Sequence, residues 1–253
     1  MPFLDHLEEL RWRIIYSLGA LVIGLAIGLY FAFAYNIIDW LQAPIMPYMA
    51  GRRLGILHPM DGFTIRLQIA FGIAAVLAAP VIGFQVWSFL APALHKPEKK
   101  IVLPVLFAAA ILFLVGAALA WFFVLPMTIK WLNALNGNSF ELNYVATEYF
   151  SMAISMVLAF GAAFEVPLLL VTLVALDILS ADLMNRSRKF AVLIIFLAAA
   201  ILSPGDAITA TLSLAIPLYF LYEVSVVVAF AIERRRRARK LREEKEAQLA
   251  ASA

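Results

Sequence analysis

The chain has 253 residues, of which 64% are hydrophobic and 15% are charged, and its mean hydropathy is +0.92. These values exclude a soluble enzyme, a collagen-like chain and a disordered chain, and they indicate an all-α integral membrane protein. The net charge of +3 arises at the end of the chain, because residues 234–246 hold eight of the 20 basic residues. We therefore expect anionic lipid, and no nucleic acid, as the partner of a basic tail over residues 234–253.

The first 14 residues are predicted to form a helix at the membrane surface. Apolar residues recur there at helical spacing, and Glu9 lies off the apolar stripe beside Leu10. Two interpretations of such carboxylates stay open from spacing alone. They are solvated acids of an interfacial helix, or they are placed on a face rich in positive charge to bind a cation.

Six apolar stretches predict one membrane domain over residues 1–233. They cover residues 14–36, 67–92, 101–129, 149–176, 190–203 and 207–232. An outside cap is expected over residues 39–66, which include Pro44. The last two uncharged runs are only 14 and 16 residues long and are joined by a turn that ends in Asp206, so we expect a short helical hairpin. Prolines within the spans predict a bent, concave arrangement.

The loop charges predict that both termini lie in the cytoplasm. Sixteen basic residues fall in the N-terminal segment, residues 95–100, residues 183–189 and the tail, whereas four fall on the opposite side.

Three polar side chains near or inside the spans are candidates for function. Glu165 is an ionisable group deep within a long apolar run, so it must face protein or water. Gln85 is a second intramembrane polar group, for which structural hydrogen bonding is the simpler interpretation. Glu98 stands among three lysines; it either forms a local ion pair or faces Glu9 and completes a two-carboxylate receptor for guanidinium groups.

No metalloprotease, hydrolase, P-loop or dinucleotide signature occurs in the sequence. Neither the histidines nor the carboxylates are spaced like metal ligands, and cysteine is absent. We therefore expect no enzyme, no cofactor and no metal. Two classes remain: a protein-binding receptor or scaffold, and a proton-coupled small-solute transporter that uses Glu165.

Four motifs resemble those of the TatC family, the six-span receptor subunits of the twin-arginine protein-export system. They are HLEELRWR from His6, PVIGFQVWSFLAPALHKPE from Pro80, AFGAAFEVP from Ala159 and QAP from Gln42. Residues 203–206 read SPGD where the family usually has TPPD, and Ala210 replaces a frequent glutamine, which weakens any role for this turn but leaves Asp206 in place.

The resemblance implies a subunit that recognises twin-arginine signal peptides at the cytoplasmic face of the bacterial inner membrane and helps to translocate folded proteins. By position, Glu9 and Glu98 would contact the two arginines, and Leu10 and Phe89 would line the groove. Glu165 and Gln85 would be intramembrane polar groups, and Pro44 and Asp206 would mark the outside cap and turn. Single-span Tat subunits would be the partners, in homo- and hetero-oligomers, with the last two helices helping them to dock.

Overall fold

The computed structural model describes residues 2–35, 37–49, 51–90, 102–136, 143–175, 177–202 and 209–251. Within this part the chain is helical, and its one β-type pairing is an isolated bridge between Gly55 and Val145. The elements in chain order are α1 (Pro2–Ala34), α2 (Ile37–Leu41), the 3-10 turn η1 (Met46–Tyr48), α3 (Asp61–Leu90), α4 (Val102–Leu119), the π-helical turn η4 (Ala120–Val124), α5 (Leu125–Asn136), α6 (Ala146–Ala175), α7 (Ala181–Arg186), α8 (Arg188–Leu202) and α9 (Thr209–Ala251).

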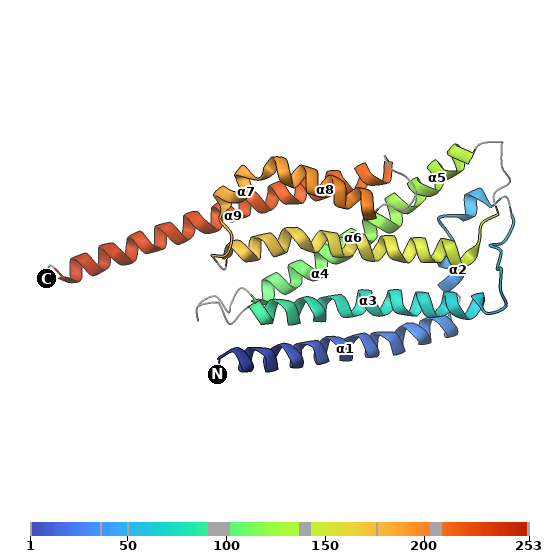
Figure 1. The fold of residues 1–253 in the computed structure, drawn as a ribbon, viewed down its shortest axis with the longest axis horizontal. Helices are drawn as coiled ribbons and strands as arrows, with labels where there is room; N and C mark the ends of the chain where they lie inside the picture. Colours follow the sequence, from blue (N-terminus) through green and yellow to red (C-terminus); the bar gives the residue numbers. More distant parts are fainter. Residues whose placement is uncertain are drawn as a thin grey trace.

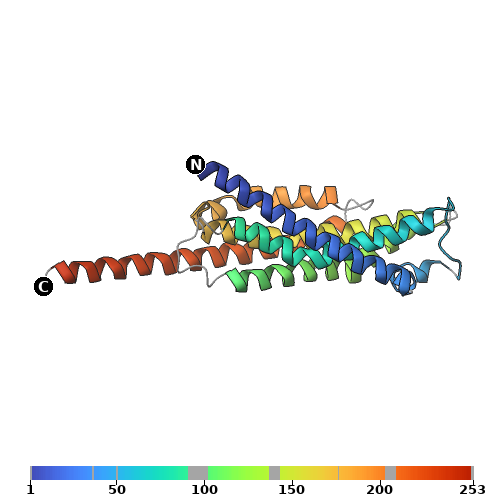
Figure 2. The ribbon, with the colours of Figure 1, turned by 90° about the horizontal axis from the view of Figure 1, so that it is seen from below.

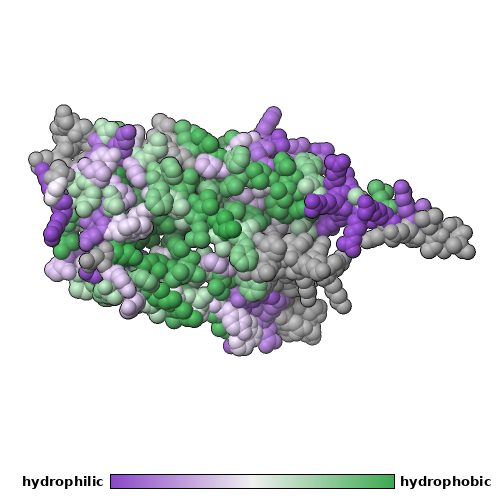
Figure 3. Space-filling model, turned by 180° about the vertical axis from the view of Figure 1, so that it is seen from behind, coloured by the Kyte–Doolittle hydropathy of each residue, from purple (hydrophilic) through white to green (hydrophobic). Residues whose placement is uncertain are grey.

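Five stretches of the described chain are long and apolar enough to cross a membrane. They are Leu7–Ala34, Asp61–Val86, Phe107–Leu135, Ala146–Ala175 and Leu214–Arg239. Apolar side chains cover the middle of the molecule, and hydrophilic ones gather at its two ends (Figure 3). This distribution is that of a multi-pass membrane protein.

The helices run roughly along one long axis, with α6 at the centre. α6 packs against α3, α4 and α9, whereas α1 packs mainly against α3 at the edge of the bundle. The start of α1 and the end of α9 lie at the same end of the long axis (Figures 1 and 2). α9 continues beyond the other helices at that end.

Small residues let α1 and α3 approach closely. Gly24 and Gly28 stand one turn apart on α1 and face Ala74 and Ala70 of α3. A Cβ added at Gly24 would lie 3.0 Å from the Cα of Ala74, and one added at Gly28 would collide with the carbonyl oxygen of Ala70. This spacing is the small-xxx-small pattern through which membrane helices gain close van der Waals contact.

The end of the molecule opposite the termini is closed by a small cap. Gly55 donates its N–H to the carbonyl of Tyr144 at 2.9 Å, and Ala146 donates to the carbonyl of Gly55 at 2.8 Å. The hydroxyl of Tyr149 donates to the carbonyl of Leu41 at 2.7 Å. These bonds tie the segment between α1 and α3 to the start of α6.

Two features differ from the sequence-based expectations. α1 is one unbroken helix of 33 residues, so its first turns continue the span and do not form a separate surface helix. A further short helix, α7, begins at an N-cap, where the Ser180 hydroxyl accepts from the N–H of Leu183.

We predict that Gly28→Ala lowers the thermal stability of the detergent-purified protein. The added methyl must push α1 away from the backbone of α3, and overpacking of this kind costs about 1–3 kcal/mol. Gly19→Ala is the matched control, since nothing lies within 4 Å of a Cβ added at Gly19. Equal melting temperatures for the two variants would contradict the close packing of α1 on α3.

Candidate functional site

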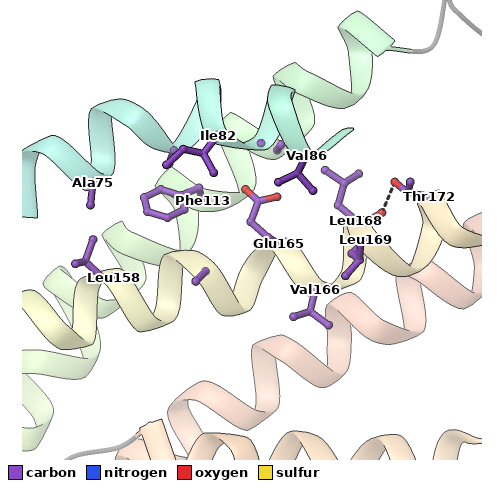
Figure 4. A pocket seen from close by; sticks show the side chains of 14 residues that line it. Ala75, Ile82, Val86, Phe113, Leu158, Glu165, Val166, Leu168, Leu169 and Thr172 are labelled. Atoms are coloured by element: carbon purple, nitrogen blue, oxygen red, sulfur yellow. Dashed lines mark hydrogen bonds between the residues drawn. The ribbon is translucent and has the colours of Figure 1, made fainter. Parts of the chain in front are cut away.

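A cavity of about 520 Å³ opens between α3, α4 and α6, and Glu165 lies in its wall. The carboxylate of Glu165 points from α6 into the space bordered by Ile82 and Val86 of α3 and by Phe113 of α4 (Figure 4). The other lining side chains are almost all apolar. They are Ala75, Ala79, Gly83, Ala109, Leu158, Ala162, Val166, Leu168, Leu169 and Thr172.

Glu165 is half-buried and makes no hydrogen bond or ion pair with any described residue. The hydroxyl of Thr172, the other polar group of the wall, donates to the carbonyl of Leu168 at 2.8 Å (Figure 4). Gln85 is half-buried on α3 but does not line the cavity, and no hydrogen bond joins it to Glu165 among the described residues. Glu165 is therefore a lone carboxyl in an apolar recess, open to an incoming donor.

A second, wholly apolar cavity of about 390 Å³ continues toward the cap. Leu158 of α6 borders both cavities. The second cavity is bordered at the cap end by Trp40 and Trp121, whose rings stack with centroids 5.2 Å apart and planes 12° apart. Trp121 belongs to the π-helical turn, and such turns often re-aim side chains at functional sites.

Glu9 lies in the second turn of α1, where it forms an ion pair with Arg13 one turn later. Leu10, the next residue, is half-buried. Phe89 is half-buried in the last turn of α3. Because α1 and α3 lie side by side and the start of α1 is at the same end as the close of α3 (Figure 1), Glu9, Leu10 and Phe89 belong to one end of the molecule.

Two of the predicted site residues, Glu98 and Asp206, lie outside the described residues. Pro44 is half-buried within the turn between α2 and η1, where Ile45 donates to the carbonyl of Gln42 at 3.0 Å. Pro44 therefore lies in the segment between α1 and α3.

The segment between α6 and α7 is held by the first residues of the basic tail. Arg236 forms an ion pair with Asp177 and donates to the carbonyl of Ala175 at 2.7 Å. The carboxylate of Glu233 accepts from the N–H of Ala181 at 2.7 Å. α9 thus satisfies backbone groups that the end of α6 and the start of α7 would leave open.

A polar network joins α7, α8 and α9 nearby. The guanidinium of Arg188 lies 3.0 Å from the carboxylate of Glu223, which also accepts from the hydroxyl of Tyr219 at 2.8 Å. The hydroxyl of Tyr222 donates to the carbonyl of Met184 at 2.7 Å, and this bond is buried. These contacts attach the short helices α7 and α8 to α9.

Sequence reasoning did not find Arg13, Arg188 or Arg236 as partners of carboxylates. Only the pair of Arg13 with Glu9 carries a sequence signal, because the two residues are four apart on one helix. Among the described residues, no group of three His, Asp or Glu side chains is arranged to hold a metal ion.

Comparison with known proteins gives a consistent result. The family model described as Sec-independent protein translocase protein (TatC) matches residues 5–217. A curated protein of that name from Magnetococcus marinus is 34% identical to this chain, over 96% of this chain and 89% of the relative. Another, from Aquifex aeolicus, is 35% identical, over 94% of this chain and 98% of the relative. Crystal structures of the twin-arginine translocase receptor TatC match with TM-scores of 0.76 and 0.77, at 33% and 34% identity, over 90% and 88% of this chain and 99% of each solved chain. None of these relatives is named as a solute transporter, so the transporter alternative finds no support in them.

We predict that Tyr222→Phe lowers the free energy of unfolding by about 1–2 kcal/mol, because it leaves the buried carbonyl of Met184 without a donor. Thermal unfolding of the detergent-purified protein measures this effect. Tyr16→Phe serves as the control, since Tyr16 is 57% exposed and its hydroxyl makes no hydrogen bond with a described residue. A loss for Tyr222→Phe no larger than that for the control would show that this bond does not hold α7 to α9.

Proposed function

This chain belongs to the TatC family of Sec-independent protein translocases, and from this membership we propose that it recognises twin-arginine signal peptides with Glu9 and Glu98. The chain is a membrane subunit of a protein-export complex. We propose, in addition, which residues perform recognition, how the chain is oriented in the membrane and which partners it has.

The observation that carries the proposal is the position of Glu9. It lies near the start of α1, which packs on α3, and the last turn of α3 bears Phe89; Glu98 follows α3 in sequence. Glu9 is 33% exposed, so its carboxylate can be reached by a ligand. Leu10 and Phe89 would then line the groove beside the two carboxylates.

Two carboxylates, Glu9 on α1 and Glu98 in the sequence that follows α3, would suit two guanidinium groups. A guanidinium offers parallel N–H donors that match both oxygens of a carboxylate, whereas an ammonium acts as a point charge. A signal with two lysines should therefore bind much less well than one with two arginines, although the total charge is the same.

The apolar part of the signal would occupy the cavity beside Glu165. The cavity lies between helices that cross the membrane and is lined mostly by apolar side chains, which suits an apolar segment. Glu165 would give a polar contact to that segment or to a single-span Tat partner helix. Gln85, on the neighbouring face of α3, would stabilise the packing of the helices, and the concave shape would follow from this recess.

We propose a six-span arrangement in the bacterial inner membrane with both termini in the cytoplasm. The start of α1, α7 and the outer turns of α9 carry basic residues in the sequence, and these elements lie at one end of the molecule (Figure 1), which agrees with the positive-inside rule. α8, with 15 residues, would be the short fifth span. The arginines at the start of the tail would contact anionic lipid, and Pro44 and Asp206 would lie outside.

In the same arrangement, α8 and α9 would dock the single-span partners. The side chains on one face of α8, such as Phe190, Ile194 and Ile201, are each more than 60% exposed. An apolar face of this kind on a short helix offers a surface to another membrane helix, and assembly of several copies would follow from it.

We predict that a labelled twin-arginine signal peptide binds the detergent-purified protein at least tenfold more tightly than its twin-lysine counterpart. Glu9→Gln or Glu98→Gln should each remove most of that preference, because a charge-assisted bidentate pair is lost. Glu8→Gln is the control, since Glu8 is an exposed neighbour on α1. Equal binding of both peptides would reject the two-carboxylate receptor.

We also predict that Gly83→Leu weakens signal-peptide binding several-fold while the arginine preference persists. Gly83 lines the cavity, and the nearest atom to an added Cβ is 3.9 Å away, so the protein can fold with a leucine that fills the space meant for the ligand. Gly19→Leu, on the open face of α1, is the control. Unchanged affinity for Gly83→Leu would place the apolar part of the signal elsewhere.

A further inference from the structure

The carboxylate of Glu9 is engaged by an arginine of its own helix. Arg13 stands one helical turn after Glu9, and its Nη2 forms an ion pair with Oε1 of the carboxylate. The group that would bind an arginine of the cargo signal therefore already holds a guanidinium, which is the same chemical group.

Arg13 is fixed in this position but incompletely satisfied. Its side chain is 18% exposed, and its Nε is buried with no acceptor among the described residues. A guanidinium carries five N–H donors, so a buried Nε without an acceptor is unfavourable. The internal pair is consequently weaker than a fully bonded guanidinium–carboxylate pair.

We propose that the guanidinium of Arg13 occupies the position on Glu9 that an arginine of the signal takes when it binds. The signal must therefore displace Arg13 from Glu9. The proposal rests on the function proposed above for Glu9. In the resting protein Arg13 keeps the carboxylate paired. It thereby sets how tightly signals bind, whereas the carboxylates themselves set the choice between arginine and lysine.

The size of the effect follows from the geometry. Ion pairs four residues apart on one helix contribute little, and this pair leaves Nε without an acceptor among the described residues, so displacement lowers the affinity of the ligand by only about two- to threefold. The same pair has to be broken whichever cation arrives. The ratio of arginine to lysine affinities is therefore independent of Arg13, although both affinities depend on it.

A purely structural role for Arg13 makes a different prediction. If the pair only steadied the first turns of α1, its loss would lower stability and would leave affinity unchanged or reduced. An increase in affinity on removal of Arg13 is thus the distinguishing result.

The test measures binding of labelled twin-arginine and twin-lysine signal peptides to the full-length protein in detergent, as wild type, Arg13→Gln, Arg13→Lys and Arg11→Gln. We expect Arg13→Gln to bind both peptides two- to threefold more tightly with an unchanged ratio between them. Arg13→Lys, which keeps the charge but loses the planar donors, should show a smaller gain. Arg11→Gln removes the same charge two residues away, from an exposed arginine that has no ion pair among the described residues, and should gain less than Arg13→Gln.

Each result decides the proposal. Unchanged or weaker binding by folded Arg13→Gln, or an equal gain in Arg11→Gln, overturns it while the receptor function stands. If Arg13→Gln does not fold, absence of any gain in Arg13→Lys overturns it equally. If the wild type itself binds both peptides alike, the receptor site at Glu9 fails, and the inference fails with it.

Discussion

The contact between α1 and α3 positions Glu9, Leu10 and Phe89 relative to one another at the end of the molecule for which recognition is proposed. α1 has little other support, since only 11% of its apolar stretch is buried within the chain, against 39% for α6. The placement of Glu9 relative to Phe89 therefore depends on how closely Gly24 and Gly28 let α1 approach α3. Between membrane helices there is little hydrophobic driving force, so close contact between small residues must supply the specificity. A recognition site that joins two helices needs its backbone fixed before its side chains can be selective.

Three carboxylates of the membrane domain, those of Glu165, Glu223 and Glu233, differ in whether they are bonded to other parts of the chain. Glu223 and Glu233 are bonded to groups on other helices or loops, and they join α9 to its neighbours. Glu165 has no such partner among the described residues and faces a recess. A carboxyl that stabilised the fold would be bonded within the chain, so the isolation of Glu165 favours a ligand-facing role for it.

The sequence predicted an all-helical membrane protein because the length and polarity of a membrane helix are imposed by the bilayer, and the described chain has five stretches that are long and apolar enough to cross. The stretches expected at 67–92 and 149–176 overlap α3 (Asp61–Leu90) and α6 (Ala146–Ala175). The ion pair of Glu223 with Arg188 was not foreseen, because the two residues are 35 apart in the chain. The π-helical turn and α7 were missed for a different reason, because neither has a distinctive hydropathy pattern. The motif resemblance, in contrast, identified the family, because several ordered motifs constrain far more than composition does.

The length of α9 carries its last turns beyond the other helices, at the end of the molecule that holds the start of α1 (Figure 1). Its 43 residues, which include Pro217, span about 65 Å at 1.5 Å per residue. Bonds at Tyr222, Glu223, Glu233 and Arg236 attach it to α7, α8 and the segment after α6, and about 22 Å of helix follows Arg236. The distance of the tail's basic residues from the bundle is therefore set by the rise of a helix that is anchored at its base, and not by the reach of a flexible chain.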